Sequence, residues 1–391
     1  MKKKMRIIYY ILIFSTLVAC TNFPYSTTPP ATPISLTESA EEITTPEAEE
    51  IPPTEDNSPK ILRLWLPPQF DPEAETDAAA LLRTRLDSFQ RRRPDLIIEV
   101  RIKAEKGQAS LLNTLITTHQ AAPSIMPDLV ALTRPDLESA AQQGILHPID
   151  GLTTLLDDPD WFPYARPLAH IQNSAYGLPF AANLLTLRYQ PAEDFPLPTI
   201  ESLTEQELQI LLPEDSTTLS FCLYDEENIE EESLTQLLSF YQSNLFTLTE
   251  TQNSLPIQWS NDFLDETPAD AILAPIPGPE GITCSLASAW IWSLAGSAPD
   301  LQPAAVELAE YLSDSTFLAE WTVAMSILPP RPTALDERKT TLHDLSLLAQ
   351  PIPSNETIEA LAEIFQAATI SVLQEQVDPS AAAQEALENI Q

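Results

Sequence analysis

The sequence has little glycine, few basic residues and few cysteines. Only 7 of its 391 residues are glycine, against 37 prolines. No glycine lies in a G-x-G-x-x-G fingerprint, a P-loop or a G-x-S-x-G elbow, which argues against the common nucleotide-binding enzymes and serine hydrolases. With 20 Lys and Arg against 57 Asp and Glu, the formal net charge is −37, which argues against nucleic acid or anionic lipid as a partner.

Cysteine and histidine are too scattered to predict a metal site. The four histidines and three cysteines show no zinc-like spacing, so we expect no metal. Cys222 and Cys284 form either a disulfide, which an extracytoplasmic location permits, or two buried free thiols. The sequence gives no distance between them, and both interpretations stay open.

The N-terminus predicts export. Lys2, Lys3, Lys4 and Arg6 precede an apolar run over 7–19, which is shorter than the about 20 residues that span a bilayer and is typical of a secretory signal. The residues Leu-Val-Ala-Cys that end at Cys20 resemble the bacterial lipobox. That resemblance implies removal of a signal peptide, 1–19, and lipidation of Cys20. The mature chain would have a formal charge of −41 and would be held at the cell membrane by lipid without spanning it.

The segment that follows Cys20 predicts a tether. Residues 21–59 contain eight Pro, eight Thr and eight acidic residues, and no Lys, Arg or Gly. Such a composition buries too little apolar surface to offset the entropy of ordering. We therefore expect 20–59 to be a lipid anchor and disordered tether, with a reach of about 100 Å when extended.

From Lys60 onward, short apolar runs alternate with helical periodicity. This alternation predicts an α/β fold with a largely parallel sheet, whose ligands lie beyond the carboxyl ends of the strands. The middle of the chain has weaker periodicity, and the tail is helical. Expected strands are 61–66, 96–102, 128–133 and 218–224; expected helices are 76–93, 108–119, 135–143, 203–212, 233–244, 303–312, 316–325, 357–377 and 380–390.

Five stretches resemble the extracellular solute-binding proteins (family 1) of ABC importers, which take up sugars and oligosaccharides. They are 138–150, with a helix, Gly144 and a Pro-Ile-Asp end; 175–189, with Tyr-Gly-Leu-Pro; 273–281; 287–292; and 328–332. The resemblance implies a type II periplasmic-binding-protein-like fold, with two α/β lobes, an interlobe hinge and ligand held between the lobes. It implies that lobe 1 comprises 60–183 and 280–328, and lobe 2 comprises 186–275 and 332–391.

A sugar presents apolar C–H faces and a rim of hydroxyls, so its site needs aromatic plates and planar polar groups. Position along the resemblance and side-chain chemistry select the candidate ligand contacts, whereas Trp292 and Trp321 are expected to be core residues. The candidates are Trp65, Tyr176, Trp259, Ser260, Ser288, Trp290 and Arg331.

The function expected from this resemblance is capture of a sugar-like solute by a lipid-anchored extracytoplasmic protein, which delivers it to ABC permease subunits. The sequence departs from the family at Ser288-Ala289, where relatives carry two glycines, and in a short lobe 2. These departures leave open a surface lipoprotein that kept the fold, lost transport binding and acts in protein interaction or sensing. An enzyme with an acid/base pair in the acidic runs 225–227 and 230–232 is disfavoured, because such runs are usually solvated, and no cofactor is expected.

Overall fold

The structure is a computed structural model that describes residues 59–390, apart from Phe195, 214–216, 225–229, 265–270, Ser297 and Glu337. The predicted signal peptide, the lipidation site at Cys20, the tether up to residue 58 and the acidic run 225–227 lie outside the described residues. No helix in the described part of the chain is both long and apolar enough to cross a membrane.

Three parallel strands and three helices form the first part of the described chain. The strands β1 (Lys60–Leu66), β2 (Leu96–Ile102) and β3 (Leu129–Thr133) lie in the order β2-β1-β3. The helices α1 (Asp77–Arg92), α2 (Leu111–Ala121) and α3 (Arg134–Gln142) begin after side-chain caps at Thr76, Ser110 and Thr133. The strand–helix alternation predicted for this region is confirmed.

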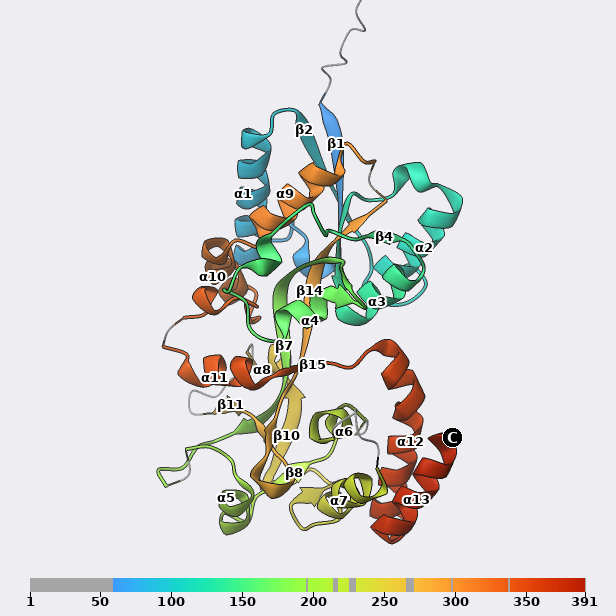
Figure 1. The fold of residues 1–391 in the computed structure, drawn as a ribbon. Helices are drawn as coiled ribbons and strands as arrows, with labels where there is room; N and C mark the ends of the chain where they lie inside the picture. Colours follow the sequence, from blue (N-terminus) through green and yellow to red (C-terminus); the bar gives the residue numbers. More distant parts are fainter. Residues whose placement is uncertain are drawn as a thin grey trace, which may run out of the picture. The chain divides into compact units, whose positions relative to one another are not determined.

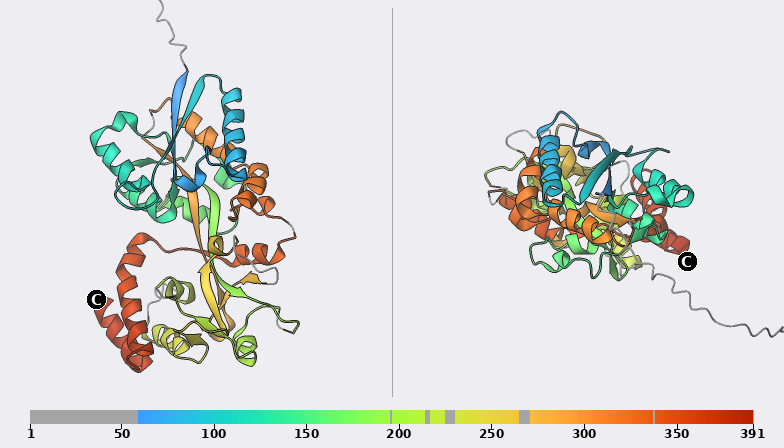
Figure 2. Two further views of the ribbon diagram at one scale, coloured as in Figure 1. Left: turned by 180° about the vertical axis from the view of Figure 1, so that it is seen from behind. Right: turned by 90° about the horizontal axis from the view of Figure 1, so that it is seen from above.

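Two long antiparallel strands run through the molecule (Figures 1 and 2). The strand β7 (Gly177–Tyr189) pairs with β14 (Leu286–Ala295), and β14 also pairs with β3. Farther along, β7 pairs with β10 (Ser254–Trp259) and β11 (Ile272–Ala274). Within the described residues the result is an 11-stranded mixed sheet, because β7 and β14 connect the parallel strands to the strands beyond them.

The sheet serves two separate hydrophobic cores, and β7 passes from one to the other between Leu184 and Leu185. The first core contains an aromatic cluster in which Phe180 stacks on Trp292 with ring centroids 4.0 Å apart. Trp292 and Trp321 are 1% and 0% exposed, so the prediction that they are core residues is confirmed. The second core is formed by β7, β8 (Gln209–Leu211), β10 and the helices around them.

The two cores refine the lobe boundaries expected above. Leu345 and Ala349 pack in the first core, whereas lobe 2 was expected to resume at 332. Cys284 and Leu286 pack in the second core, although lobe 1 was expected to resume at 280. An amphipathic pattern identifies the buried face of a segment and not which of two cores that face meets, so the sequence misplaced these segments.

The weakly periodic middle region differs most from the expected elements. The expected strand 218–224 is the helix α6 (Thr217–Leu223). The expected helix 203–212 is a short helix, α5 (Ile200–Glu205), followed by Glu207 at φ 53° and the strand β8. A short apolar run does not distinguish a buried strand from a buried helix, which explains both errors.

The other elements complete the two lobes. Helices are α4 (Ala165–Ala169), α7 (Glu231–Tyr241), α8 (Ser260–Leu264), α9 (Gln302–Leu312), α10 (Ser315–Ala324), α11 (Thr340–Leu348), α12 (Asn355–Leu373) and α13 (Pro379–Ile390); short strands are β4 (Leu146–His147), β5 (His170–Ile171), β6 (Ser174–Ala175), β9 (Phe246–Thr247), β12 (Ile276–Pro277), β13 (Thr283–Cys284) and β15 (Gln350–Pro351). The 3₁₀ turns among the described residues are Pro68–Phe70, Pro123–Ile125, Leu155–Asp157, Pro279–Gly281 and Pro332–Ala334.

Candidate functional site

The carboxyl ends of β1, β2 and β3 lie at one edge of the first lobe's sheet. Because the three strands are parallel, this edge gathers the residues that follow each of them. Trp290 of β14 is the register partner of Thr133, the last residue of β3, and so lies at the same edge. An aromatic side chain and the first turn of α3 are therefore brought together.

Trp290 is partly exposed at this edge. One side of its indole meets Phe70 edge-on, with ring centroids 5.2 Å apart, and the rest is only partly covered. Ser288 precedes it by two residues on β14 and is also partly exposed. Since side chains two apart on a strand share a face, Ser288 and Trp290 offer a hydroxyl and an aromatic plate on one surface.

Asp136 lies one turn into α3, close to the same edge. Its backbone N–H donates to Thr133 Oγ1 at 3.3 Å. Burial raises the pKa of Asp136; a hydrogen bond to Thr133 lowers it in part, and the nearby carboxylate of Glu105 raises it again. A half-buried carboxyl group of this kind accepts hydrogen bonds from hydroxyl groups when ionised and donates one when protonated.

Asn183 lies on β7 directly opposite Ser288. Its Oδ1 accepts hydrogen bonds from Ser260 Oγ at 3.0 Å and from the Asn261 backbone N–H at 3.1 Å. These bonds fix the amide so that its nitrogen points away from α8. Asn183 was not among the contacts expected from the sequence, although a polar residue that interrupts the apolar run 178–185 is a signal that could have found it.

Trp259 ends β10 and is partly buried against the second core. It is the register partner of Leu185, two residues beyond Asn183 on β7. Trp259, Asn183 and Ser288 therefore lie around the point at which β7 leaves the first core.

Two of the predicted contacts, Trp65 and Ser260, are buried and present no surface to a ligand. Trp65 is 1% exposed, and Lys103 Nζ lies 4.4 Å from the centre of its ring. Ser260 is 0% exposed. Its hydroxyl donates to Asn183 Oδ1 and accepts from the Leu184 N–H at 3.0 Å, so both its donor and an acceptor position are already used. These predictions were wrong because position along the chain does not give burial.

Arg331 is also buried, and its guanidinium pairs with two aspartates of the first lobe. It is 5% exposed, and its guanidinium pairs with Asp160 at 3.1 Å and Asp158 at 2.8 Å while lying over the ring of Trp161. The arginine therefore joins segments of the first lobe and does not face a ligand.

Tyr176 lies at the wrong end of β7. Its neighbour Gly177 pairs with Ser293, near the start of β3, whereas Trp290 pairs with the end of β3. The register partner of Trp290 on β7 is Ala181, five residues after Tyr176. At a rise of about 3.3 Å per residue, Tyr176 lies well away from Trp290 along the strand. The resemblance gives no strand register, and the register places this side chain away from Trp290.

The structure places Cys222 and Cys284 in a disulfide within the second core, with Cα atoms 5.8 Å apart. Of the two interpretations that the sequence left open, this geometry corresponds to the bonded one. Among the described residues, no group of three or more His, Cys, Asp and Glu side chains has a metal-binding arrangement.

Comparison with solved structures identifies the fold, although no protein-family model and no curated protein sequence matches the chain. The sugar-binding protein MalE of Xanthomonas citri superposes with a TM-score of 0.65 at 19% identity, covering 85% of this chain and 96% of its own. An extracellular solute-binding protein of Staphylococcus aureus, solved in complex with maltose, gives 0.67 at 15% identity, covering 85% and 97%. The maltodextrin-binding protein MalE1 of L. casei BL23 gives 0.64 at 14% identity, covering 85% and 99%. The chain has the two-lobe fold of these solute-binding proteins.

In this solute-binding fold, the connection that leads into α12 is held against α3. Asn355, the first residue of α12, donates its side-chain N–H to Pro135 O at 2.9 Å and to Ser139 Oγ at 3.1 Å. Its backbone N–H donates to Glu138 Oε2 at 3.1 Å, and Glu138 is paired with Arg134 in a buried ion pair at 3.0 Å. The helix that presents Asp136 is therefore also bonded to the start of a helix of the second core.

Proposed function

We propose that this protein is an extracytoplasmic solute-binding protein that captures a sugar or oligosaccharide for an ABC importer. The shared fold supports the class of protein. The observation that carries the proposal is the partly exposed Trp290, which lies at the carboxyl edge of the sheet beside Ser288 and opposite the first turn of α3.

The proposed ligand contacts combine an apolar surface with hydrogen-bonding groups. Trp290 and Trp259 would stack on the C–H faces of the sugar, since aromatic rings bury large apolar areas. Ser288, Asn183 and Asp136 would bond its hydroxyl groups. Two of these five residues, Asn183 and Asp136, come from the structure, and the other three were expected from the sequence.

Binding would act through the two lobes. Trp290 and Asp136 belong to the first lobe, whereas Trp259 packs on the second core, so a ligand that contacts both sets favours the state in which the lobes are close. A ligand shifts such an equilibrium by its differential affinity for the two states. The closed state would then be the form presented to the permease.

The proposal includes attachment to the membrane through a lipid on Cys20. The four residues ending at Cys20 and the acidic, proline-rich segment after it support a lipoprotein whose binding lobes stand away from the bilayer. Replacement of Cys20 by Ala should release the protein from the membrane fraction into the soluble extracytoplasmic fraction. Retention in the membrane fraction would contradict lipid anchoring.

The test of ligand binding is calorimetry of the purified protein with maltose, maltotriose and longer maltodextrins, alongside mass spectrometry of molecules that co-purify with it. Trp290→Ala should weaken binding by about 1–3 kcal/mol, as expected for a buried aromatic contact. Trp290→Phe is the matched control, since it keeps a smaller aromatic plate and should retain part of the affinity. Unchanged affinity in Trp290→Ala would remove this residue from the site.

A second function, in protein interaction or sensing, is favoured by the strand at Ser288-Ala289. At these two positions the resemblance leads us to expect glycines, which let a ligand approach the backbone closely. This chain has side chains there instead, and Ala289 is 3% exposed. Thermal unfolding distinguishes the two functions, because a binder gains stability with ligand concentration. An unchanged midpoint with every sugar, polyol and small acid would favour the second function.

A further inference from the structure

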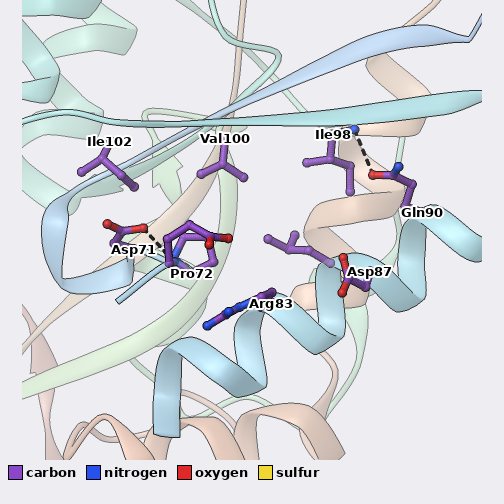
Figure 3. Close-up of a pocket in the computed structure, with 10 residues that line it drawn as sticks. Asp71, Pro72, Arg83, Asp87, Gln90, Ile98, Val100 and Ile102 are labelled. Carbon is purple, nitrogen blue, oxygen red and sulfur yellow. Dashed lines mark hydrogen bonds between the residues drawn. The ribbon is translucent and has the colours of Figure 1, made fainter. Parts of the chain in front are cut away.

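A groove of about 490 Å³ lies between α1 and the strand β2, on the first lobe. Its strand side carries Ile98, Val100 and Ile102, which alternate along β2 and point toward α1 in Figure 3. These three side chains are only partly covered, and Ile102 is 37% exposed. The groove is thus a row of apolar side chains that α1 does not cover completely.

The strand β2, which carries these three side chains, is also an edge strand of the described sheet. In the strand order of the described residues β2 is the outermost strand, paired on one side with β1. The Ile98 N–H is directed away from β1, toward Gln90 Oε1 at 3.4 Å, whereas the Lys103 N–H bonds Leu66 O of β1 at 2.8 Å. Because N–H groups alternate along a strand, those of Val100 and Ile102 share the outward direction of Ile98.

The groove is acidic at both ends. Asp71 lies toward the Ile102 end and Asp87 toward the Ile98 end in Figure 3. Glu73 adds a third carboxylate, while Arg83 is the basic residue of the lining. A cationic occupant would therefore be attracted and an anionic one repelled.

This charge decides among the candidate occupants. The chain's own segment 21–59 has eight acidic residues and no Lys or Arg, so the groove would repel it. A second copy would bring the same three carboxylates and a formal charge of −37. An external segment with positive charge meets neither obstacle.

We propose that the outer edge of β2 is a docking site for an extended, basic peptide segment of a partner protein. The segment adds to the sheet as a further strand, with its backbone bonded to the outward N–H and C=O groups of Val100 and Ile102 and to the C=O of Ile98, whose own N–H donates to Gln90. Its apolar side chains pack on the same three residues. Lys or Arg near its two ends pairs with Asp71 and Glu73 at one end and with Asp87 at the other. None of the residues that line the groove is among the proposed sugar contacts, and the nearest approach is Asp71, which follows Phe70, whose ring meets Trp290.

The first test measures fluorescence polarisation of a labelled, end-blocked peptide, Lys-Val-Thr-Val-Thr-Val-Lys, with the full chain. We expect a Kd below about 1 mM, which corresponds to about −4 kcal/mol. A peptide with Pro in place of the central Val removes a backbone donor, and one with Glu in place of both Lys reverses the charge. Each of these should bind at least tenfold more weakly. No binding of the first peptide, or equal binding of all three, would overturn the proposal.

The second test uses matched variants of the protein. Val100→Lys places a charge in the apolar row, and Asp87→Lys reverses an exposed rim charge on α1; each should weaken binding of the first peptide at least tenfold. Ile97→Lys, on the opposite face of β2, and Glu359→Lys, an equal charge change on α12, should leave binding unchanged. Equal loss in the controls would show non-specific attraction and refute the site. A dimer in sedimentation that Val100→Lys dissociates would show that a second copy occupies the edge, which also refutes the proposal.

Discussion

The two hydrophobic cores are reinforced by different kinds of polar interaction. In the first lobe, Arg331 is buried between two aspartates, and Arg134 pairs with Glu138. The second core contains the disulfide between Cys222 and Cys284 and a buried hydroxyl pair, Ser220 with Tyr241 at 3.1 Å. The comparison indicates that the stability of the first lobe depends on ionisation and that of the second on the redox state.

The largest effect tests whether the cores are independent. Trp292→Ala removes a 1%-exposed indole from the first core, and Phe365→Ala removes a 1%-exposed ring from the second. Each should lower the free energy of unfolding by about 3–5 kcal/mol, because the lost packing leaves a cavity. Since β7 and β14 contribute to both cores, we expect one cooperative transition in urea that both variants shift.

Two separate transitions, of which each variant moves only one, would contradict this expectation. That outcome would make the lobes independent folding units despite the continuous sheet. Each core would then have a measurable stability of its own.

The next largest effect is expected from removal of the disulfide in the second core. The disulfide closes a loop over a sequence separation of 62 residues. Replacement of Cys222 and Cys284 by Ala should lower the free energy of unfolding by roughly 2–4 kcal/mol, because the cross-link restricts the unfolded chain. Chemical denaturation with and without reductant provides the measurement: the wild type should lose stability when reduced, and the double variant should not respond. An unaffected wild type that is shown to be fully reduced would contradict the prediction.

A smaller effect concerns the connection between the lobes. Asn355→Ala removes the side-chain hydrogen bonds to Pro135 and Ser139, at about 1 kcal/mol for a typical bond. We expect a small loss of stability together with a changed separation of the lobes, measured by small-angle X-ray scattering. Ser371→Ala, on the same helix, is the control. If scattering and stability both stay at wild-type values, these bonds do not hold the connection.

The smallest effect is expected from Asp160, the carboxylate that pairs with Arg331 in the first lobe. Burial raises the pKa of Asp160, but hydrogen bonds from Thr333, Ser315 and Arg331 outweigh burial, so its pKa lies below the ordinary 3.8. A carboxyl group whose pKa is lower in the folded chain stabilises it above the unfolded pKa and loses this contribution as pH falls through the folded value. The wild type should therefore lose more stability than Asp160→Asn when urea unfolding at pH 5 is compared with that at pH 3. Equal losses would show that Asp160 contributes no pH dependence.

The first three strands and helices could be predicted because their signals are local. The helix expected over 76–93 is α1, Asp77–Arg92, since Thr76 caps it and apolar residues recur at helical spacing. In the second lobe, the run that forms α6 has no such signals, and its helical state is decided by packing in the second core. The candidate site was predicted in part for the same reason: Trp290 and Ser288 follow from their stretch of sequence, whereas Asn183 is selected only by its register opposite Ser288.

The sequence by itself determined the α/β class, the order of strands and helices at the start of the fold, and the aromatic residues that are candidates for ligand contact. Periodicity, caps and composition give these features because they are properties of neighbouring residues. The tertiary structure decided which of the candidate side chains are exposed, and it buries Trp65, Ser260 and Arg331. Trp290 and Trp292 have the same parity on β14, so alternation cannot separate them. A register shift between Trp290 and Ile291, and the stacking of Phe180 on Trp292, leave one indole partly exposed at the edge of the sheet and the other buried. Burial depends on residues brought together from distant parts of the chain, which no local pattern contains.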